Sequence, residues 1–386
     1  MAQRGLPKEK PRAQLFSKPF TFLSDLSRLL PESQRFTVPN ENFTARPYLV
    51  IWEATQACAL ACCHCRAEAV PGAHPLQLSR QEASRLIGAV VEAGPELFVI
   101  TGGDPMMRPD LLDIICEASR KGLRVCLSPS ATPRMARADL KSFCEAGLAG
   151  ISLSLDGPDA ASHDAFRGVP GTWRRSMDIL ERCRHLSLPV QINTTLTVAN
   201  INRFEEFARM VESIQPASWS LFVLVPLGRA QISDLPSPKC LEHFLNRLSD
   251  FAEQVPFRVK TTEAPQFRRI LLEREKSNRS KATILGPSTN AGRGFLFISH
   301  TGEIYPSGFL PIHTGNIRIH RLVDVYRTHP LFVDLRNPAK LKGKCGRCGF
   351  NTVCGGSRAR AYAVHGDPFA SDPLCCFQPD QESSLP

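Results

Sequence analysis

Three cysteines on one short stretch of the chain could hold an iron-sulfur cluster. Cys58, Cys62 and Cys65 are separated by three and then two residues, so their thiolates can gather on a single loop. Thiolates are the usual protein ligands of such clusters, and a cubane held by three cysteines keeps one iron open to a small molecule. The competing interpretation is a loop of buried or zinc-binding cysteines, because short motifs also occur by chance.

A second group of four cysteines closes the chain. Cys345, Cys348 and Cys354 are separated by two and five residues, and Cys375 follows after twenty more. Four thiolates fully ligate a cubane or a zinc ion. Zinc ribbons also use C-x2-C pairs, but the wide, asymmetric spacing and the upstream cluster motif favour iron-sulfur. A fully ligated cluster could pass electrons without binding a cofactor.

Alternating strand and helix patterns surround the first cysteine group. Helical spacing of apolar residues separates six short apolar runs, which predicts parallel strands joined by helical crossovers and an α/β fold. Six strands are fewer than the eight of a closed barrel. The expected strands are 48–52, 96–101, 123–127, 151–155, 189–197 and 218–225.

Polar residues cluster where these strands end, which is where parallel sheets usually bind ligands. Paired glycines let a backbone approach a ligand closely, and a carboxylate can accept a hydrogen bond from an ammonium group. Taken one at a time, the same residues would also suit ordinary turns and polar strand ends. The candidates are Gly102, Gly103 and Asp104, then Ser154, Asp156 and Arg167, and finally Asn193 and Thr195.

The cysteine triplet, followed one crossover later by Gly102-Gly-Asp-Pro105, resembles the radical S-adenosylmethionine (radical SAM) enzymes. The resemblance implies a partial (β/α)6 barrel and a 4Fe-4S cluster whose open iron binds S-adenosylmethionine. One-electron reduction then releases a 5'-deoxyadenosyl radical. It also implies that Asp104 holds the cofactor's amino group, although relatives have Glu there. His64 replaces the family's usual aromatic residue before the last cysteine.

The remaining candidates take their roles from the same resemblance. It implies that Ser154 and Arg167 meet the carboxylate of the cofactor and that Asp156 assists its ribose. Asn193 and Thr195 are interpreted as further cofactor contacts. No side chain is assigned as catalytic beyond the ligands, because the first step needs no general base.

The tail, with Gly355-Gly-Ser357-Arg358, is similar to the SPASM or twitch extension of radical SAM enzymes. The similarity extends to the haem-pathway subgroup, which includes an iron-coproporphyrin decarboxylase and a haem d1 synthesis enzyme. Ser307 and Ser357 stand where some relatives have cysteine, which argues for a single auxiliary 4Fe-4S cluster. The predicted parts are a basic lead (1–45), the core barrel (46–230), a helical and loop connection (231–289) and the SPASM/twitch domain (290–386).

Two classes of substrate fit this prediction. One is a tetrapyrrole or other anionic small molecule, whose carboxylates Lys260, Arg268 and Arg269 could bind. The other is a ribosomally made peptide. A hypothesis of a different class is a non-catalytic iron-sulfur or zinc protein.

Composition limits the partners and the compartment. The formal charge of +10 over 386 residues suits an acidic electron carrier such as flavodoxin or ferredoxin, and a generally basic surface would give the same value. The scattered charges argue against nucleic acid, and no apolar run is long enough for a membrane span. Fourteen cysteines without an export signal predict reduced thiols and a cytoplasmic protein.

Overall fold

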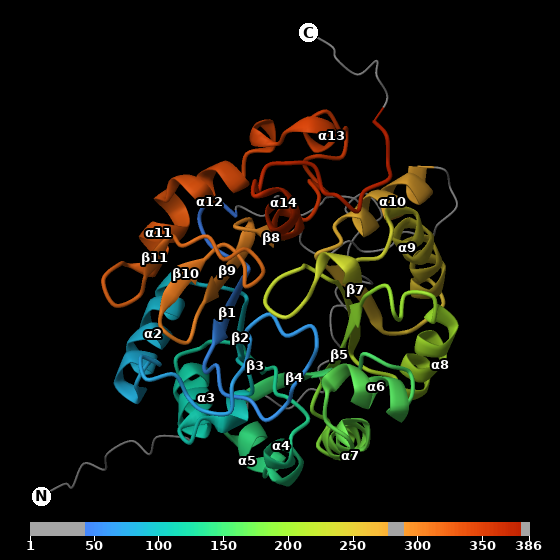
Figure 1. Cartoon of the computed structure of the whole chain (residues 1–386). Helices are drawn as coiled ribbons and strands as arrows, with labels where there is room; N and C mark the ends of the chain where they lie inside the picture. The colour runs from blue at the N-terminus through green and yellow to red at the C-terminus, as the bar shows by residue number, and fades with distance from the viewer. Residues whose placement is uncertain (1–42, 277–288, 380–386) are drawn as a thin grey trace, which may run out of the picture. The chain divides into compact units, whose positions relative to one another are not determined.

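Parallel strands β1 to β7 run side by side in sequence order through the centre of the fold (Figure 1). A computed structural model describes residues 43–276 and 289–379 of the chain, so most of the predicted lead (1–45) lies outside the described residues. The six predicted strands are confirmed as β1 to β6, and with them the α/β class. Their bounds are β1 Leu49–Glu53, β2 Leu97–Thr101, β3 Val125–Leu127, β4 Leu148–Ser154, β5 Val190–Leu196 and β6 Ser218–Val223.

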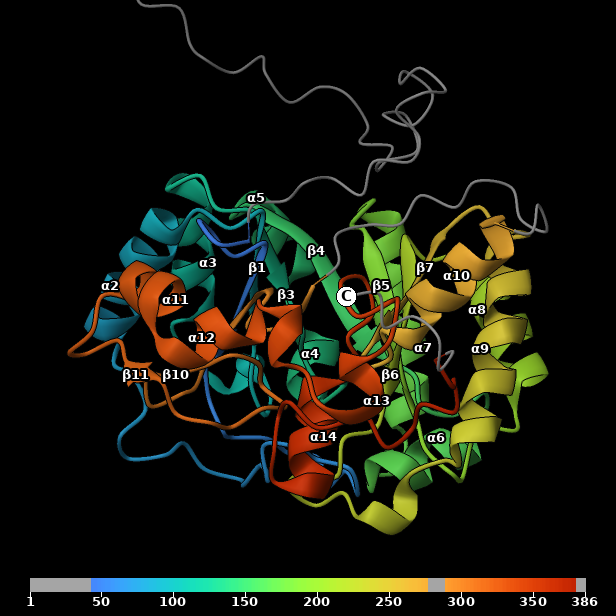
Figure 2. The same ribbon diagram turned by 90° about the horizontal axis from the view of Figure 1, so that it is seen from above.

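Helices join successive strands and pack against the outer face of the curved sheet (Figure 2). Alternation along each strand turns residues such as Val50 and Trp52 outward, where they are fully buried under the helices. Ser79 caps α2 with Glu82 in a capping box. The helices are α2 Arg80–Ala93, α3 Leu111–Arg120, α4 Pro133–Arg137, α5 Leu140–Glu145, α6 Ala160–Arg167, α7 Thr172–His185 and α8 Phe204–Ile214.

A seventh parallel strand, β7 (Arg258–Thr262), extends the sheet beside β6. This strand was not predicted from the sequence, in which the segment stands out only for its charges. The reason is physical, because Val259 is its one apolar residue and no position of the strand is fully buried. Helix α9 (Pro238–Ala252) leads into β7, and α10 (Gln266–Lys276) follows it.

The C-terminal part continues the same sheet on its other side. Strand β9 (Gly294–Ile298) pairs in parallel with β1, and β10 (Glu303–Tyr305) turns back antiparallel to β9. Gly302 makes this turn possible with a φ of 86°. The other elements are β8 Asn290–Ala291, β11 Gly315–Asn316, α11 Leu322–Thr328, α12 Pro330–Leu335, α13 Gly343–Gly346 and α14 Arg358–His365.

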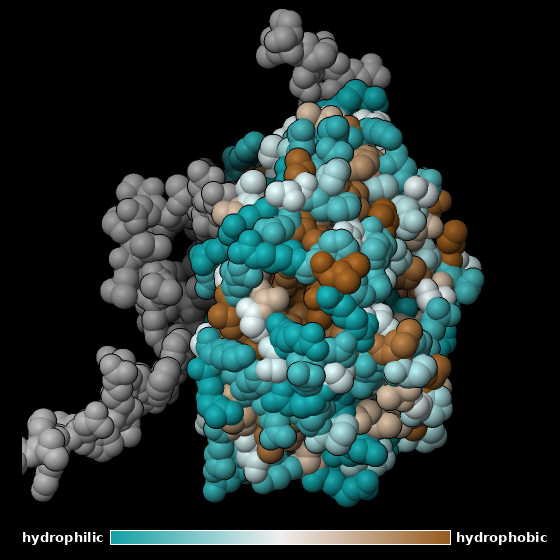
Figure 3. All heavy atoms as spheres, turned by 90° about the vertical axis from the view of Figure 1, so that its left-hand side faces the viewer, coloured by the Kyte–Doolittle hydropathy of each residue, from teal (hydrophilic) through white to brown (hydrophobic). Residues whose placement is uncertain are grey.

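The face of the molecule that carries α2 and α11 is largely hydrophilic, with apolar atoms gathered near its centre (Figure 3). Isolated apolar side chains also remain exposed in the described chain, among them Leu76 and Ile319. None of the helices within residues 43–276 and 289–379 has the length and apolar character that crossing a membrane requires.

Candidate functional site

An open cavity of about 1210 Å³, including the part that faces solvent, lies at the carboxyl ends of the central strands. Its lining includes apolar groups such as Leu60, Phe222 and Phe309 and polar residues at the strand ends. The structure therefore brings most of the predicted site residues around one space. Those that line it are Cys58, Cys62, Cys65, Gly102, Gly103, Ser154, Arg167, Asn193 and Thr195.

The three cysteine sulfurs of this cavity accept hydrogen bonds from the chain around them. The Leu60 amide donates to Cys58 Sγ over 3.3 Å, and the Ala69 amide donates to Cys65 Sγ over 3.5 Å. The Arg167 guanidinium donates to Cys62 Sγ over 3.7 Å. Donors of this kind stabilise negative charge on sulfur and tune iron-sulfur clusters, so the surroundings fit three cluster-bound thiolates.

Gly102 and Gly103 make room for the cysteine loop itself. A Cβ atom on Gly103 would lie 2.5 Å from the Gln56 carbonyl oxygen and 2.6 Å from that of Ala57. The Gly103 amide donates to the Thr55 carbonyl over 2.7 Å. The close backbone approach predicted at these glycines is present, and its partner in this structure is the loop that carries the cysteines.

We expect Gly103→Ala to displace the cysteine loop, because the added methyl group meets backbone rather than a flexible side chain. Overpacking of this kind typically costs about 1–3 kcal/mol of stability. Iron content after anaerobic reconstitution should also fall. Gly88→Ala is the matched control, since nothing lies within 4 Å of its added Cβ on α2. Equal iron content in the two variants would contradict this role for Gly103.

Asp104, predicted to hold the cofactor's amino group, lies beside the cavity rather than in its lining. Its side chain is fully buried and does not line the cavity. The carboxylate accepts hydrogen bonds from the Thr132 hydroxyl (2.7 Å), the Met106 amide (3.1 Å) and the Ser130 amide (3.3 Å). Burial raises its pKa above the ordinary value. Asp104 thus anchors the loop that places the Ser130 hydroxyl 3.7 Å from Cys58 Sγ.

Asp156 is also buried behind the cavity, where it forms an ion pair with Arg167. Its carboxylate accepts the Thr195 amide over 2.6 Å. Burial alone would raise the pKa of Asp156, but the Arg167 guanidinium brings it below the ordinary value. Arg167 therefore connects the Asp156 carboxylate to Cys62, while Ser154 and Asn193 line the cavity directly.

Two further residues around the cavity, His64 and Arg229, were not predicted from the sequence to be part of the site. His64 packs against Phe166 with ring centroids 4.3 Å apart, and burial lowers its pKa to about 4, which keeps it neutral. The Arg229 guanidinium donates to the Cys62 and Ala69 carbonyls over 3.1 and 2.8 Å. Arg229 follows the sixth strand in the sequence, but no local pattern could reveal its contacts with the cysteine loop.

A second salt-bridged group borders the cavity on the β9 side. The Arg66 guanidinium forms an ion pair with Glu53 (2.5 Å) and lies over the Phe297 ring at 4.7 Å. The other Glu53 oxygen is 2.7 Å from His300 Nδ1. Burial acts to raise the pKa of Glu53, and Arg66 and His300 hold it below the ordinary value. His300 and Phe297 reach this group only because β9 pairs with β1, so no local pattern could reveal their part in it.

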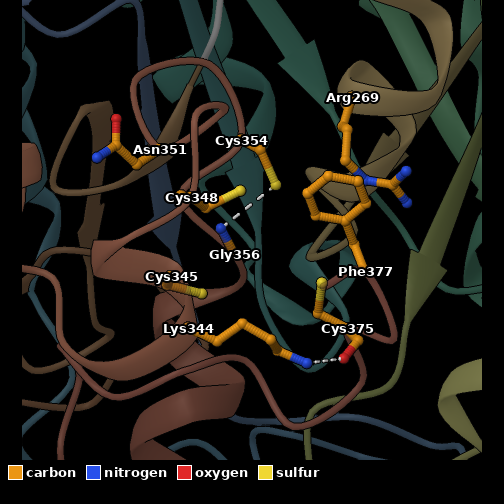
Figure 4. A pocket seen from close by; sticks show the side chains of 10 residues that line it. Arg269, Lys344, Cys345, Cys348, Asn351, Cys354, Gly356, Cys375 and Phe377 are labelled. Carbon is orange, nitrogen blue, oxygen red and sulfur yellow. Dashed lines mark hydrogen bonds between the residues drawn. The ribbon is translucent and has the colours of Figure 1, made fainter. Parts of the chain in front are cut away.

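The four tail cysteines line a second cavity of about 350 Å³ (Figure 4). Within residues 43–276 and 289–379, no three Cys, His, Asp or Glu side chains converge as the ligands of a single metal ion would. Thiolates on one zinc ion lie about 2.3 Å from it and therefore about 4 Å from each other. The lining cysteines are Cys345, Cys348, Cys354 and Cys375.

Burial makes two of these thiols costly to ionise without a cation. It raises the pKa of Cys354 to about 12 and that of Cys375 to about 11. Metal binding would supply the missing positive charge and release protons. The Gly356 amide donates to Cys354 Sγ over 3.5 Å, and Arg358 donates to Cys345 Sγ over 3.6 Å.

Arg269, predicted as a possible substrate clamp, belongs to this second cavity instead. Its guanidinium forms ion pairs with Glu242 and Glu273 and lies over the Phe377 ring at 4.7 Å. The cation therefore already has carboxylate partners. The position of Arg269 in the sequence could not show which cavity it borders, because this depends on α10 turning away from the strand ends after β7.

A buried ion pair joins the two cavities. Arg360 is completely buried and donates to both oxygens of Asp372, over 3.0 and 2.8 Å. Its third nitrogen lies 3.3 Å from the Leu224 carbonyl, at a residue that lines the first cavity. The Asp372 amide donates to Cys345 Sγ over 3.4 Å. Burial would raise the pKa of Asp372, but Arg360 holds it below the ordinary value.

Comparison with known proteins agrees with this geometry. Residues 52–213 match the model of the radical SAM superfamily. An AdoMet-dependent heme synthase of Oleidesulfovibrio alaskensis is 40% identical over 340 residues, which cover 86% of this chain and 87% of the relative. A heme synthase of the same description from Methanosarcina barkeri is 33% identical, covering 88% of this chain and 99% of the relative.

A solved structure shares the fold at lower identity. SuiB of Streptococcus suis, bound to its precursor peptide SuiA, superposes with a TM-score of 0.65 and 17% identity. The match covers 86% of this chain and 76% of SuiB.

Proposed function

The chain belongs to the radical SAM superfamily and is an enzyme that uses a 4Fe-4S cluster and S-adenosylmethionine, and we propose that its substrate is a tetrapyrrole carrying carboxylate groups. The observation that carries this proposal is the 40% identity, over most of both chains, to an AdoMet-dependent heme synthase. We further propose that the reaction is an oxidation or decarboxylation of a substrate side chain.

We assign the binding of these cofactors to the first cavity. When bound, they supply a 5'-deoxyadenosyl radical that removes a hydrogen atom from the substrate. Cys58, Cys62 and Cys65 would hold the cluster. Gly102 and Gly103 would keep the cysteine loop against the strand ends. The side chains that would contact S-adenosylmethionine are Ser154, Arg167, Asn193 and Thr195.

Asp104 and Asp156, both predicted to contact the cofactor, are proposed to position other groups instead. Asp104 would act through Ser130, whose hydroxyl neighbours Cys58, and Asp156 would act through Arg167 and the Thr195 amide. Neither carboxylate needs to touch the cofactor in this arrangement. The cavity walls would exclude water from the reactive carbon.

The tail would form a SPASM/twitch domain with one auxiliary 4Fe-4S cluster on Cys345, Cys348, Cys354 and Cys375. Such a cluster could take the electron left on the substrate radical. A flavodoxin or ferredoxin would reduce the first cluster, attracted by the formal charge of +10.

The lining of the first cavity suits a flat macrocycle. Phe222 and Phe309 lie with ring centroids 6.4 Å apart, and Leu224 and Val225 add further apolar lining. Aromatic and aliphatic walls bind the faces of large ring systems, while polar groups fix their orientation. The alternative is maturation of a ribosomal peptide. It rests on fold similarity to SuiB at 17% identity.

Production of 5'-deoxyadenosine tests the proposal. Protein reconstituted anaerobically with iron and sulfide, then reduced with dithionite, should cleave S-adenosylmethionine faster when iron coproporphyrin III is added. Loss of carbon dioxide from the porphyrin, measured by mass spectrometry, should accompany the cleavage. Stimulation by a precursor peptide, with no response to any tetrapyrrole, would favour the alternative.

A further inference from the structure

The inner face of the sheet carries a row of polar side chains that starts at the first cavity and runs toward the amino ends of β5 and β6. Asn193 lines the cavity, and its side chain accepts a hydrogen bond from Gln191 over 2.7 Å. The Ser218 hydroxyl of β6 donates to Gln191 over 3.2 Å. These contacts place the inward side chains of β5 and β6 in one connected layer, where a closed barrel would hold aliphatic residues.

Strand β7 adds two cations to this face. Side chains alternate along a strand, and Val259 packs outward against the hydrophobic core, so Arg258 and Lys260 point inward. The hydroxyls of Ser220 and Thr262, 3.4 Å apart, show the same inward face joining β6 and β7. Lysine and arginine therefore border the polar row from its β7 side.

Strand register sets the height of Lys260 inside the barrel. Lys260 is paired with Ser220 of β6, and Ser220 is paired with Asn193 of β5. Adjacent strands lie about 4.8 Å apart, so the backbones of Lys260 and Asn193 are about 10 Å apart at the same level. Lys260 does not itself line the cavity, but a lysine side chain at this level can reach a ligand group that extends past Asn193 toward β7.

The Lys260 side chain is partly buried and lacks a counter-charge in the described chain. No carboxylate of residues 43–276 and 289–379 forms an ion pair with it, whereas the buried Arg269 and Arg360 each have acidic partners. Burial, together with the Arg258 charge, lowers the pKa of Lys260 to about 8, so it is still mostly protonated at pH 7. A partly buried cation without a partner loses some of its hydration, and an anionic ligand would offset that loss.

We propose that Lys260, supported by Arg258, binds a carboxylate group of the substrate at the inner face of β7. This inference rests on the proposed function, because a tetrapyrrole with propionate side chains supplies the carboxylate. The macrocycle would lie against Phe222 and Phe309 while one propionate extends toward Lys260. The site therefore orients the substrate and discriminates against porphyrins that lack a free acid at that position.

Binding titrations followed by porphyrin absorbance test the site without turnover. For the reconstituted full chain, Lys260→Met should weaken binding of iron coproporphyrin III about 10- to 100-fold, the effect expected of a lost charge-assisted hydrogen bond. Lys260→Arg should retain most of the affinity. The tetramethyl ester should bind the wild type at least about 10-fold more weakly than the free acid, and Lys260→Met should not weaken it further.

Lys141→Met is the matched control, because Lys141 is an exposed lysine of α5 paired with Glu145. It should leave both affinities unchanged. Equal affinity of wild type and Lys260→Met for the free acid would overturn the inference while leaving the proposed function intact. If the variant loses its iron, equal wild-type affinity for acid and ester would overturn it instead. A wild type that binds no tetrapyrrole would remove the proposed function, and this site with it.

Discussion

Joint replacement of Cys58, Cys62 and Cys65 by alanine should abolish S-adenosylmethionine cleavage. The three thiolates are the only protein ligands we assign to the first cluster, and the remaining cavity residues offer no substitute set. Reconstituted protein should lose about four irons per chain and keep those of the auxiliary cluster. Iron analysis, electron paramagnetic resonance and 5'-deoxyadenosine assays would measure the change.

Cys63→Ala provides the control for this triple replacement. Cys63 lies between two of the proposed ligands but is exposed, and its thiol contacts only the Phe166 carbonyl in the described chain. Its replacement should leave iron content and cleavage nearly unchanged. Full cleavage by the triple variant would show that the radical chemistry does not depend on this loop, and the assignment of the first cavity would fail.

Arg360→Met should cause the largest loss of stability of any single replacement we consider. It would leave the fully buried Asp372 carboxylate without its main counter-charge, and breaking such a pair from one side typically costs about 3–5 kcal/mol. The Leu224 carbonyl would also lose a donor. Anaerobic urea unfolding of the reconstituted protein would measure the loss.

Glu145→Gln is the matched control for the buried pair. Glu145 pairs with Lys141 over 3.8 Å, and both side chains are largely exposed, so its replacement should change stability by about 0–1 kcal/mol. If Arg360→Met were as mild as Glu145→Gln, the pair would not be the connection between the two cavities that its contacts indicate.

Local chemistry made much of this site predictable. The cysteine groups are short motifs whose spacing favours cluster binding, and apolar runs alternating with helical periods identify parallel strands. Gly102 and Gly103 also signalled a close backbone approach. In each case the residues that carry the information are neighbours in the sequence.

Long-range pairing accounts for what the sequence could not reveal. β7 lacked an apolar pattern because its inner face is polar. The direction of the Asp104 carboxylate depends on Ser130 and Thr132, which arrive with the next crossover. Arg269 and Lys260 looked equivalent in the sequence, and only the turn into α10 separates an arginine of the auxiliary cavity from a lysine inside the barrel.

The pairing of β9 with β1 has a consequence for synthesis on the ribosome. β1 is translated early, but its second neighbour emerges only when most of the chain has been made. At about 5–20 residues per second, one edge of β1 stays open for roughly tens of seconds. An open strand edge is prone to pair with other chains. Nascent copies should therefore depend on chaperones, and truncation before residue 290 should yield aggregates rather than a smaller working enzyme.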